Sequence, residues 1–195
     1  MDRYKANNTA KIGLLAAVAT LLMFFELPVP MLPVFLKLDI SELPAVIAAF
    51  SLGPAAAVLV DLVKNLIHAT NTQTAGIGEV ANFIVGVAFL VPAGIVYRRR
   101  PAFGGALLAL TAGTASMIAV ASFMNYFVLI PLYQAVLHFP MEQIIAMGAA
   151  ANPHIVDLKT FVTLAVAPFN AIKGAVITAF TLLIYRKVLP LLRAG

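Results

Sequence analysis

The stretch PAVIAAFSLGPAAAVLVDLVKNLIH, residues 44–68, decides the fold, because the dipeptide Gly53-Pro54 divides it into two apolar segments. Pro54 has no backbone N–H and suits the first turn of a helix, whereas Gly53 suits a tight turn. We therefore predict one helix at about 42–51 and a second helix that begins at Pro54. The first of these helices is too short to span a bilayer, so it must be shielded by protein or cross only part of the membrane.

The rest of the chain is equally apolar. Of the 195 residues, 62% are hydrophobic and only 11% are charged, and the mean hydropathy is +0.99. Soluble domains carry about 25% charged residues. Further apolar runs cover about 10–27, 77–97, 103–136 and 156–190. Together with the divided run they make six segments, which predicts an integral protein of the cell membrane.

The basic residues support six segments rather than five. Six segments place the chain start, the loop after residue 97 and the chain end on one side of the membrane, as the positive-inside tendency requires. The basic residues concerned are Arg3, Lys5, Lys11, Arg98, Arg99, Arg100, Arg186, Lys187 and Arg193. We therefore predict an all-α, six-helix bundle with cytoplasmic N- and C-termini, formed by residues 1–195 as a single domain.

Prolines and polar loops add detail to this bundle. Pro131 and Pro168 predict bends in the two longest helices. The outer loops at 27–41, 69–78 and 137–157 could together roof a pocket that opens outward. In the first of them, Ser41 is a candidate N-cap for the short helix.

Lys173 is the most informative polar residue, since it lies in the middle of an apolar run with Asn170 one turn before it. A charged side chain at the bilayer centre costs about 3 kcal/mol on insertion scales and normally faces a protein interior or a wet cavity. The two residues share a helix face. They could recognise a polar ligand, or they could tie helices together. Asn125 and Tyr126 leave the same two readings open.

Other polar residues fall in the apolar runs around residues 61–82. Asp61 and Lys64 are three residues apart, which favours an internal ion pair over ligand contact. Glu79 and Asn82 also share a face, and Glu79 lies near the outer boundary, where it is either a solvated carboxylate or a functional one. Asp39 lies in the first outer loop.

Enzyme signatures are missing from the sequence. His68, His138 and His154 lack metal-site spacing, and there is no cysteine, no catalytic motif and no Walker A sequence. The segment 76–81 matches G-x-G-x-x-A but follows a polar loop instead of a strand. We therefore expect no catalytic residue, no metal and no cofactor. The basic residues cluster at chain ends and in one loop, which argues against nucleic-acid binding.

The first helix offers small residues for close helix packing. Gly13 and Ala17 are four apart, as are Ala16 and Thr20. Gly13, Ala16 and Ala17 are therefore candidates for docking a partner helix.

Several strings together resemble one family. They are FLKLDISELPA (35–45), FSLGPAAAVLVDLVKNLIH (50–68), GEVANFIVG (78–86), NYFVLIPLY (125–133) and PFNAIKG (168–174). They are similar to the riboflavin-binding S component of energy-coupling factor (ECF) transporters. The resemblance implies six helices with cytoplasmic ends, a flavin pocket near the outer face, and a coupling module of one transmembrane T component and two cytoplasmic ATPases.

The resemblance also implies roles for particular residues. Asn125, Asn170 and Lys173 match positions that contact the isoalloxazine ring, and Asp39 matches a position near the bound vitamin. The first helix carries Gly13 where the family's docking motif has alanine. An asparagine amide offers a donor and an acceptor to the polar edge of the ring, and Asp39 can accept from ribityl hydroxyls. Tyr126, Glu79 and Asn82 complete the candidate site. Riboflavin is expected as transported substrate.

Three other functions remain open at this point. The chain could be an S component for another vitamin, or a self-sufficient proton-coupled carrier that uses Asp61 or Glu79. A membrane-embedded enzyme with a catalytic Lys173 is the third, and it lacks an acid/base constellation.

Overall fold

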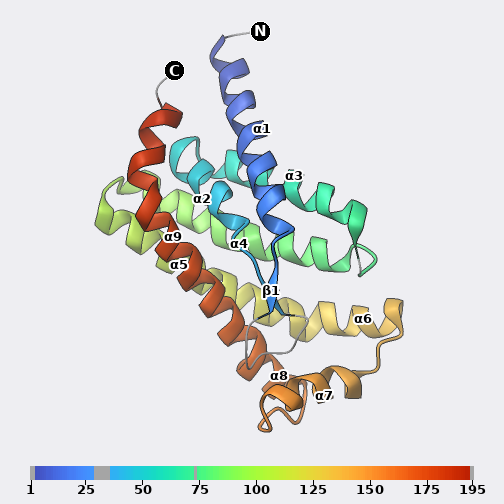
Figure 1. Cartoon of the computed structure of the whole chain (residues 1–195). Coiled ribbons are helices and arrows are strands. Elements are labelled where there is room, and N and C mark those ends of the chain that lie inside the picture. Colours follow the sequence, from blue (N-terminus) through green and yellow to red (C-terminus); the bar gives the residue numbers. More distant parts are fainter. Residues whose placement is uncertain (1–2, 29–35, 73, 194–195) are drawn as a thin grey trace.

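The computed structural model describes residues 3–28, 36–72 and 74–193, which are helical over most of their length. Figure 1 shows how the helices are arranged. In chain order the elements are α1 (Arg3–Met23), β1 (Leu27–Pro28), β2 (Lys37–Leu38), α2 (Glu42–Ser51), α3 (Pro54–His68), η1 (Ala69–Asn71), α4 (Ile77–Arg99), α5 (Phe103–Met124), η2 (Asn125–Leu129), α6 (Ile130–Leu137), α7 (Met141–Ala151), α8 (Leu158–Phe161), η3 (Val162–Val166) and α9 (Ala167–Arg193).

The break at Gly53-Pro54 separates α2 from α3, as predicted. Gly53 has a φ of +107°, which L side chains rarely adopt, and Pro54 lies in the first turn of α3. Residues 42–50 of α2 are all buried. The helix packs against α1, α3, α4 and α9. The prediction that protein shields this short helix is therefore confirmed.

Four helical stretches are long and apolar enough to cross a membrane. They are Ala6–Met23, Ile77–Arg99, Phe103–Leu137 and Leu158–Leu192. With α2 and α3 they make the six-segment bundle, and α7 lies outside it. The two termini lie at the same end of the bundle, and α6, α7 and α8 lie at the other (Figure 1). The end that carries the termini is the cytoplasmic end, because the basic residues concentrate there.

Both long helices change their winding just before a proline. The five-residue π-helices η2 and η3 end two residues before Pro131 and Pro168, respectively. A proline cannot donate the usual backbone hydrogen bond, and a wider π-turn accommodates the loss. The predicted bends are therefore local π-turns. They matter because Asn125 begins η2, and Asn170 and Lys173 follow η3.

The outer surface of the bundle suits lipid. Large apolar side chains are exposed on several helices, among them Leu14, Leu66 and Leu183. The core beneath is built largely from alanine and aliphatic side chains of α2, α4 and α5, so these helices approach one another closely. The protein is an integral membrane protein.

The first outer loop is only partly described. Its two ends pair as an antiparallel ribbon, with Leu27 opposite Leu38 and Pro28 opposite Lys37. The segment 29–35, which carries part of the predicted pocket roof, lies outside the described residues. Asp39 follows β2 directly, and α2 begins three residues later.

Candidate functional site

Lys173 lies inside the bundle, as its cost in lipid requires. The residue is 6% exposed, and the Nζ atom is 2.9 Å from Oδ2 of Asp39 and 3.4 Å from Oδ1 of Asn82. The ammonium therefore joins α9 to the first outer loop and to α4. The structure brings together three of the predicted site residues.

Asp39 is held on both of its oxygens. Oδ2 accepts from Lys173, and Oδ1 accepts from the backbone N–H of Ser41 at 2.8 Å and from the Ser41 hydroxyl. Burial alone would raise the pKa of the Asp39 carboxyl, but the ammonium groups of Lys173 and Lys64 outweigh it and hold that pKa below its usual range. The carboxylate is therefore ionised at neutral pH.

A second buried lysine lies behind this pair. Lys64 is fully buried, and its Nζ atom is 2.6 Å from Oε1 of Glu42 and 3.1 Å from Oδ1 of Asp61. It also donates to the Ser41 hydroxyl at 2.9 Å. The predicted ion pair between Asp61 and Lys64 is confirmed. Ser41 occupies the N-cap position of α2, but its side chain makes no capping bond and bridges Asp39 and Lys64 instead.

Two asparagines complete the circuit. Asn65 donates to Oδ1 of Asp61 at 3.1 Å, and Asn82 donates to Oδ1 of Asn65 at 3.0 Å. Asn82 then accepts from Lys173. The result is a closed chain of polar contacts, which we call the polar ring. Its members are Asp39, Ser41, Lys64, Asp61, Asn65, Asn82 and Lys173, with Glu42 attached through Lys64.

The polar ring is tightly enclosed at Asp61. A Cβ atom at Gly86 of α4 would lie 2.5 Å from Oδ2 of Asp61, so no larger residue fits there without movement. Oδ2 of Asp61 and Oε2 of Glu42 are buried and have no hydrogen-bond partner among the described residues. Glycine at this position lets α4 close over the buried carboxylate.

Asn125 and Asn170 both lie near a π-turn: Asn125 is the first residue of η2, and Asn170 follows the end of η3 by four residues. The amide nitrogen of each donates to the carbonyl four residues earlier, at 2.9 Å from Asn125 to Ala121 and at 2.8 Å from Asn170 to Val166. In the part of the chain that the structure describes, the amide oxygens receive no hydrogen bond. Both side chains are thus fixed through nitrogen and leave an acceptor available.

Glu79 and Tyr126 lie apart from the polar ring. Glu79 accepts from Nδ1 of His68 at 3.0 Å and from the Thr72 hydroxyl at 2.8 Å, at the outer end of α4. Tyr126 is 37% exposed and packs edge-on against Phe127, with ring centroids 4.7 Å apart. Neither residue makes a described contact with Lys173.

The candidate docking residues on α1 divide between two faces. Gly13 and Ala17 are exposed, whereas Ala16 is 2% exposed and belongs to the core. The carbonyl of Ala16 accepts from the Thr20 hydroxyl. A helix that docks on α1 from outside could therefore reach Gly13 and Ala17 but not the side chain of Ala16.

Sequence reasoning missed Glu42 and Ser41 as members of the polar network. Ser41 was expected only as a helix N-cap, and no role was expected for Glu42. A signal was nevertheless present, because an apolar helix that includes both Asp61 and Lys64 needs further polar partners for two buried charges.

The arrangement defines a class of protein: a membrane-embedded helical bundle with a network of charged and polar side chains buried inside it. A family model described as "ECF transporter, substrate-specific component" matches residues 7–185, so the chain belongs to that family. It is a transporter subunit and not an enzyme.

Two known transporters and one solved structure are similar to this chain over nearly its whole length. The riboflavin transporter RibU of Staphylococcus aureus (strain TCH60) is 35% identical over 182 residues, which cover 93% of this chain and 90% of the relative. The riboflavin transporter FmnP of Bacillus subtilis (strain 168) is 35% identical over 189 residues, 95% and 94% of the two chains. The solved structure of the S component of a bacterial ECF transporter matches with a TM-score of 0.78 and 32% identity, covering 97% and 99% of the two chains.

Proposed function

We propose that this protein captures riboflavin from outside the cell and imports it together with an ATP-driven ECF module. The observation that carries the proposal is the pair of carboxamides near the π-turns, each fixed through nitrogen with its oxygen unused, together with the buried ammonium of Lys173, one helical turn after Asn170. Relatives that cover nine-tenths of the chain are named riboflavin transporters. The vitamin would be bound as cargo and not used as a cofactor.

The hydrogen-bonding groups of riboflavin match these side chains. The isoalloxazine edge presents a ring N–H between two carbonyls. The free amide oxygen of Asn125 or Asn170 can accept from that N–H. Lys173 has three N–H donors, of which two point to Asp39 and Asn82, so one remains for a ring carbonyl. Such a site discriminates strongly, because an analogue without the matching group leaves a buried polar atom unpaired.

Asp39 and the aromatic residues would hold the rest of the ligand. The Asp39 carboxylate keeps lone pairs that can accept from ribityl hydroxyls. Phe123, Tyr126 and Phe127 form a continuous aromatic cluster, with ring centroids 4.9 Å and 4.7 Å apart, that can cover a flat ring. Glu79 is already engaged by His68, so we assign it a supporting role at the outer end of α4.

Transport requires an energy source outside this chain, because the sequence has no Walker A motif. We propose a T component and two cytoplasmic ATPases as partners, with the exposed Gly13 and Ala17 on α1 as the docking face. The small residues allow close helix approach. A proton-coupled carrier is less well supported, because Asp61 is fully buried and paired with Lys64.

The proposal is tested first by the absorption spectrum and by titration. Purified protein should carry flavin bands or quench riboflavin fluorescence stoichiometrically, and it should prefer the unphosphorylated vitamin, because the outer side has no basic cluster. A colourless protein that leaves riboflavin fluorescence unchanged would refute the proposal that riboflavin is the substrate. In vesicles, this chain alone should not accumulate riboflavin; accumulation driven by a proton gradient would refute the need for an ATP-driven partner.

A further inference from the structure

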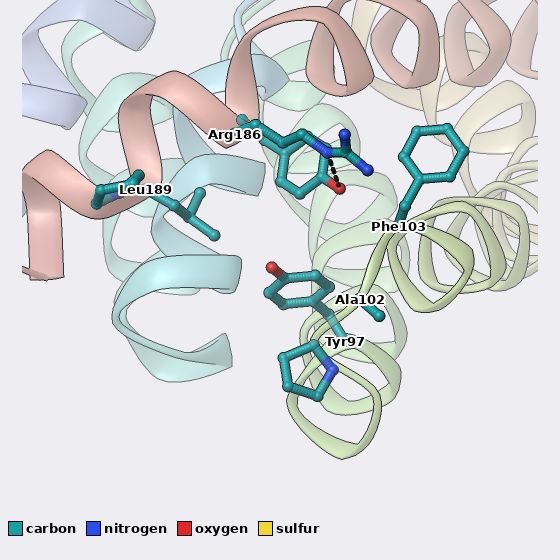
Figure 2. A pocket seen from close by; sticks show the side chains of 8 residues that line it. Tyr97, Ala102, Phe103, Arg186 and Leu189 are labelled. Carbon is teal, nitrogen blue, oxygen red and sulfur yellow. Dashed lines mark hydrogen bonds between the residues drawn. The ribbon is translucent and has the colours of Figure 1, made fainter.

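A cavity lies at the cytoplasmic end of the bundle, away from the polar ring. It measures about 490 Å³, within the range of about 300–1,000 Å³ that is typical of small-ligand sites. The end of α4, the turn at 101–103 and the last turns of α9 line it, and it is open to the surface. Figure 2 shows Tyr97, Ala102, Phe103, Arg186 and Leu189 around this space. None of the residues proposed to bind riboflavin lines it.

Arg186 is the one charged residue among those that line the cavity. Its Nε atom is 3.4 Å from the Tyr185 hydroxyl, and its guanidinium carbon lies 4.9 Å from the centroid of the Phe103 ring (Figure 2). Among the described residues, no carboxylate pairs with it. Arg186 is thus oriented by two aromatic neighbours, while its charge is not neutralised.

The surroundings of the cavity are basic. Arg98, Arg99 and Arg100 precede the turn at 101–103, and Lys187 follows Arg186. No carboxylate lies among the lining residues. This end of the bundle faces the cytoplasm, where anionic lipids give the membrane surface a negative potential that attracts such residues. The site therefore favours an anionic ligand.

The apolar surface next to Arg186 indicates where the rest of the ligand lies. Leu183 is three residues before Arg186 on α9, so it shares the same helix face one turn closer to the membrane centre. Its side chain is 73% exposed. A phospholipid whose phosphate meets Arg186 could lay an acyl chain along Leu183, whereas a free phosphate would make no use of that surface.

We propose that this cavity binds the headgroup of an anionic phospholipid of the cytoplasmic leaflet. Arg186 donates paired hydrogen bonds to the phosphate oxygens, an arrangement that a guanidinium favours. Tyr97, Phe103 and Leu189 line the space around the glycerol, and the neighbouring arginines favour net negative lipids over zwitterionic ones.

Native mass spectrometry of the whole protein in detergent tests this site. The protein is stripped of copurified lipid and titrated with phosphatidylglycerol or phosphatidylcholine carrying identical acyl chains. We expect tighter retention of phosphatidylglycerol. Arg186→Gln should weaken it about fivefold, the effect of one interfacial cationic side chain. Lys187→Gln, which removes the same charge one residue away and outside the cavity, should weaken retention clearly less than Arg186→Gln does.

Three results would overturn the proposal. Equal weakening in both variants would mean that diffuse charge attracts the lipid, and equal retention of the two lipids would remove the anionic preference. Displacement by inorganic phosphate would assign the site to a free anion. Because Arg186 is exposed, the variant should fold, which far-ultraviolet circular dichroism checks. The readout counts bound lipid only, so it is independent of the riboflavin proposal.

Discussion

Replacing Lys64 by methionine should destabilise the protein severely. The Lys64 side chain is fully buried and is the direct cationic partner of Glu42 and Asp61, at 2.6 Å and 3.1 Å. Methionine fills a similar volume but leaves two buried carboxylates without that cation. Breaking a buried pair by removing one partner costs about 3–5 kcal/mol. We expect a loss of that size in the free energy of unfolding.

A matched control exists in the same protein. Lys37 pairs with Glu26 at 2.7 Å, almost the same distance, but the two side chains are 43% and 29% exposed. An exposed pair contributes less than about 1 kcal/mol. Lys37→Met should therefore change stability little, although it removes the same charge and an ion pair of the same length.

Unfolding in mixed micelles, followed by circular dichroism, compares the two variants. Adding Glu42→Gln to Lys64→Met should recover part of the loss, because one of the two uncompensated charges disappears. Similar losses for Lys64→Met and Lys37→Met would refute the reasoning, because burial would then have no effect on the cost. A double variant less stable than Lys64→Met alone would also count against it.

Three further predictions follow from the site. Lys173→Met should weaken riboflavin binding by at least about 1–2 kcal/mol, which is the scale of a lost charge-assisted hydrogen bond. Lys159→Met, at an exposed lysine, should leave binding unchanged. Unchanged affinity in titrations of folded Lys173→Met would mean that Lys173 has only a structural role. Gly86→Ala should lower the melting temperature because its Cβ would lie 2.5 Å from a buried carboxylate oxygen, whereas Gly104→Ala, with nothing within 4 Å, should be neutral or stabilising. The pKa of Asp39 is lowered in the folded state, so its contribution to stability is fully present above its unfolded pKa of about 3.9 and is lost only as pH falls further. The stability difference between the wild type and Asp39→Asn should therefore stay constant from pH 5 to pH 8, and a slope in that difference would contradict the assignment.

Helix boundaries were predictable where the backbone itself is restricted. Pro54 fixes φ and lacks a backbone donor, and Gly53 tolerates a positive φ, whatever surrounds them, so the break between α2 and α3 could be predicted from two residues. Pro131 and Pro168 predicted irregular backbone in the two longest helices for the same reason. The form of this irregularity, a π-turn instead of a kink, could not be predicted, because it depends on how the neighbouring helices accommodate the wider turn.

The members of the polar ring were only partly predictable. Asp61 and Lys64 are three residues apart on one helix, so local geometry alone predicted their contact. The contact between Lys173 and Asp39 joins residues 134 positions apart, and helix periodicity carries no information about such a pairing. Ala16 shows the same limit, because a four-residue spacing of small side chains does not reveal which face of α1 points inward.

The enclosed position of α2 has a consequence for how this protein is made. Ten residues of helix rise about 15 Å, half of the hydrocarbon thickness, so α2 cannot be anchored in the bilayer by its own length. Among the helices that surround it is α9, which the ribosome synthesises after the other three. Biogenesis therefore has to leave the surroundings of α2 incomplete until α9 has been made, and a nascent chain halted before α9 would expose α2 to quality-control proteases.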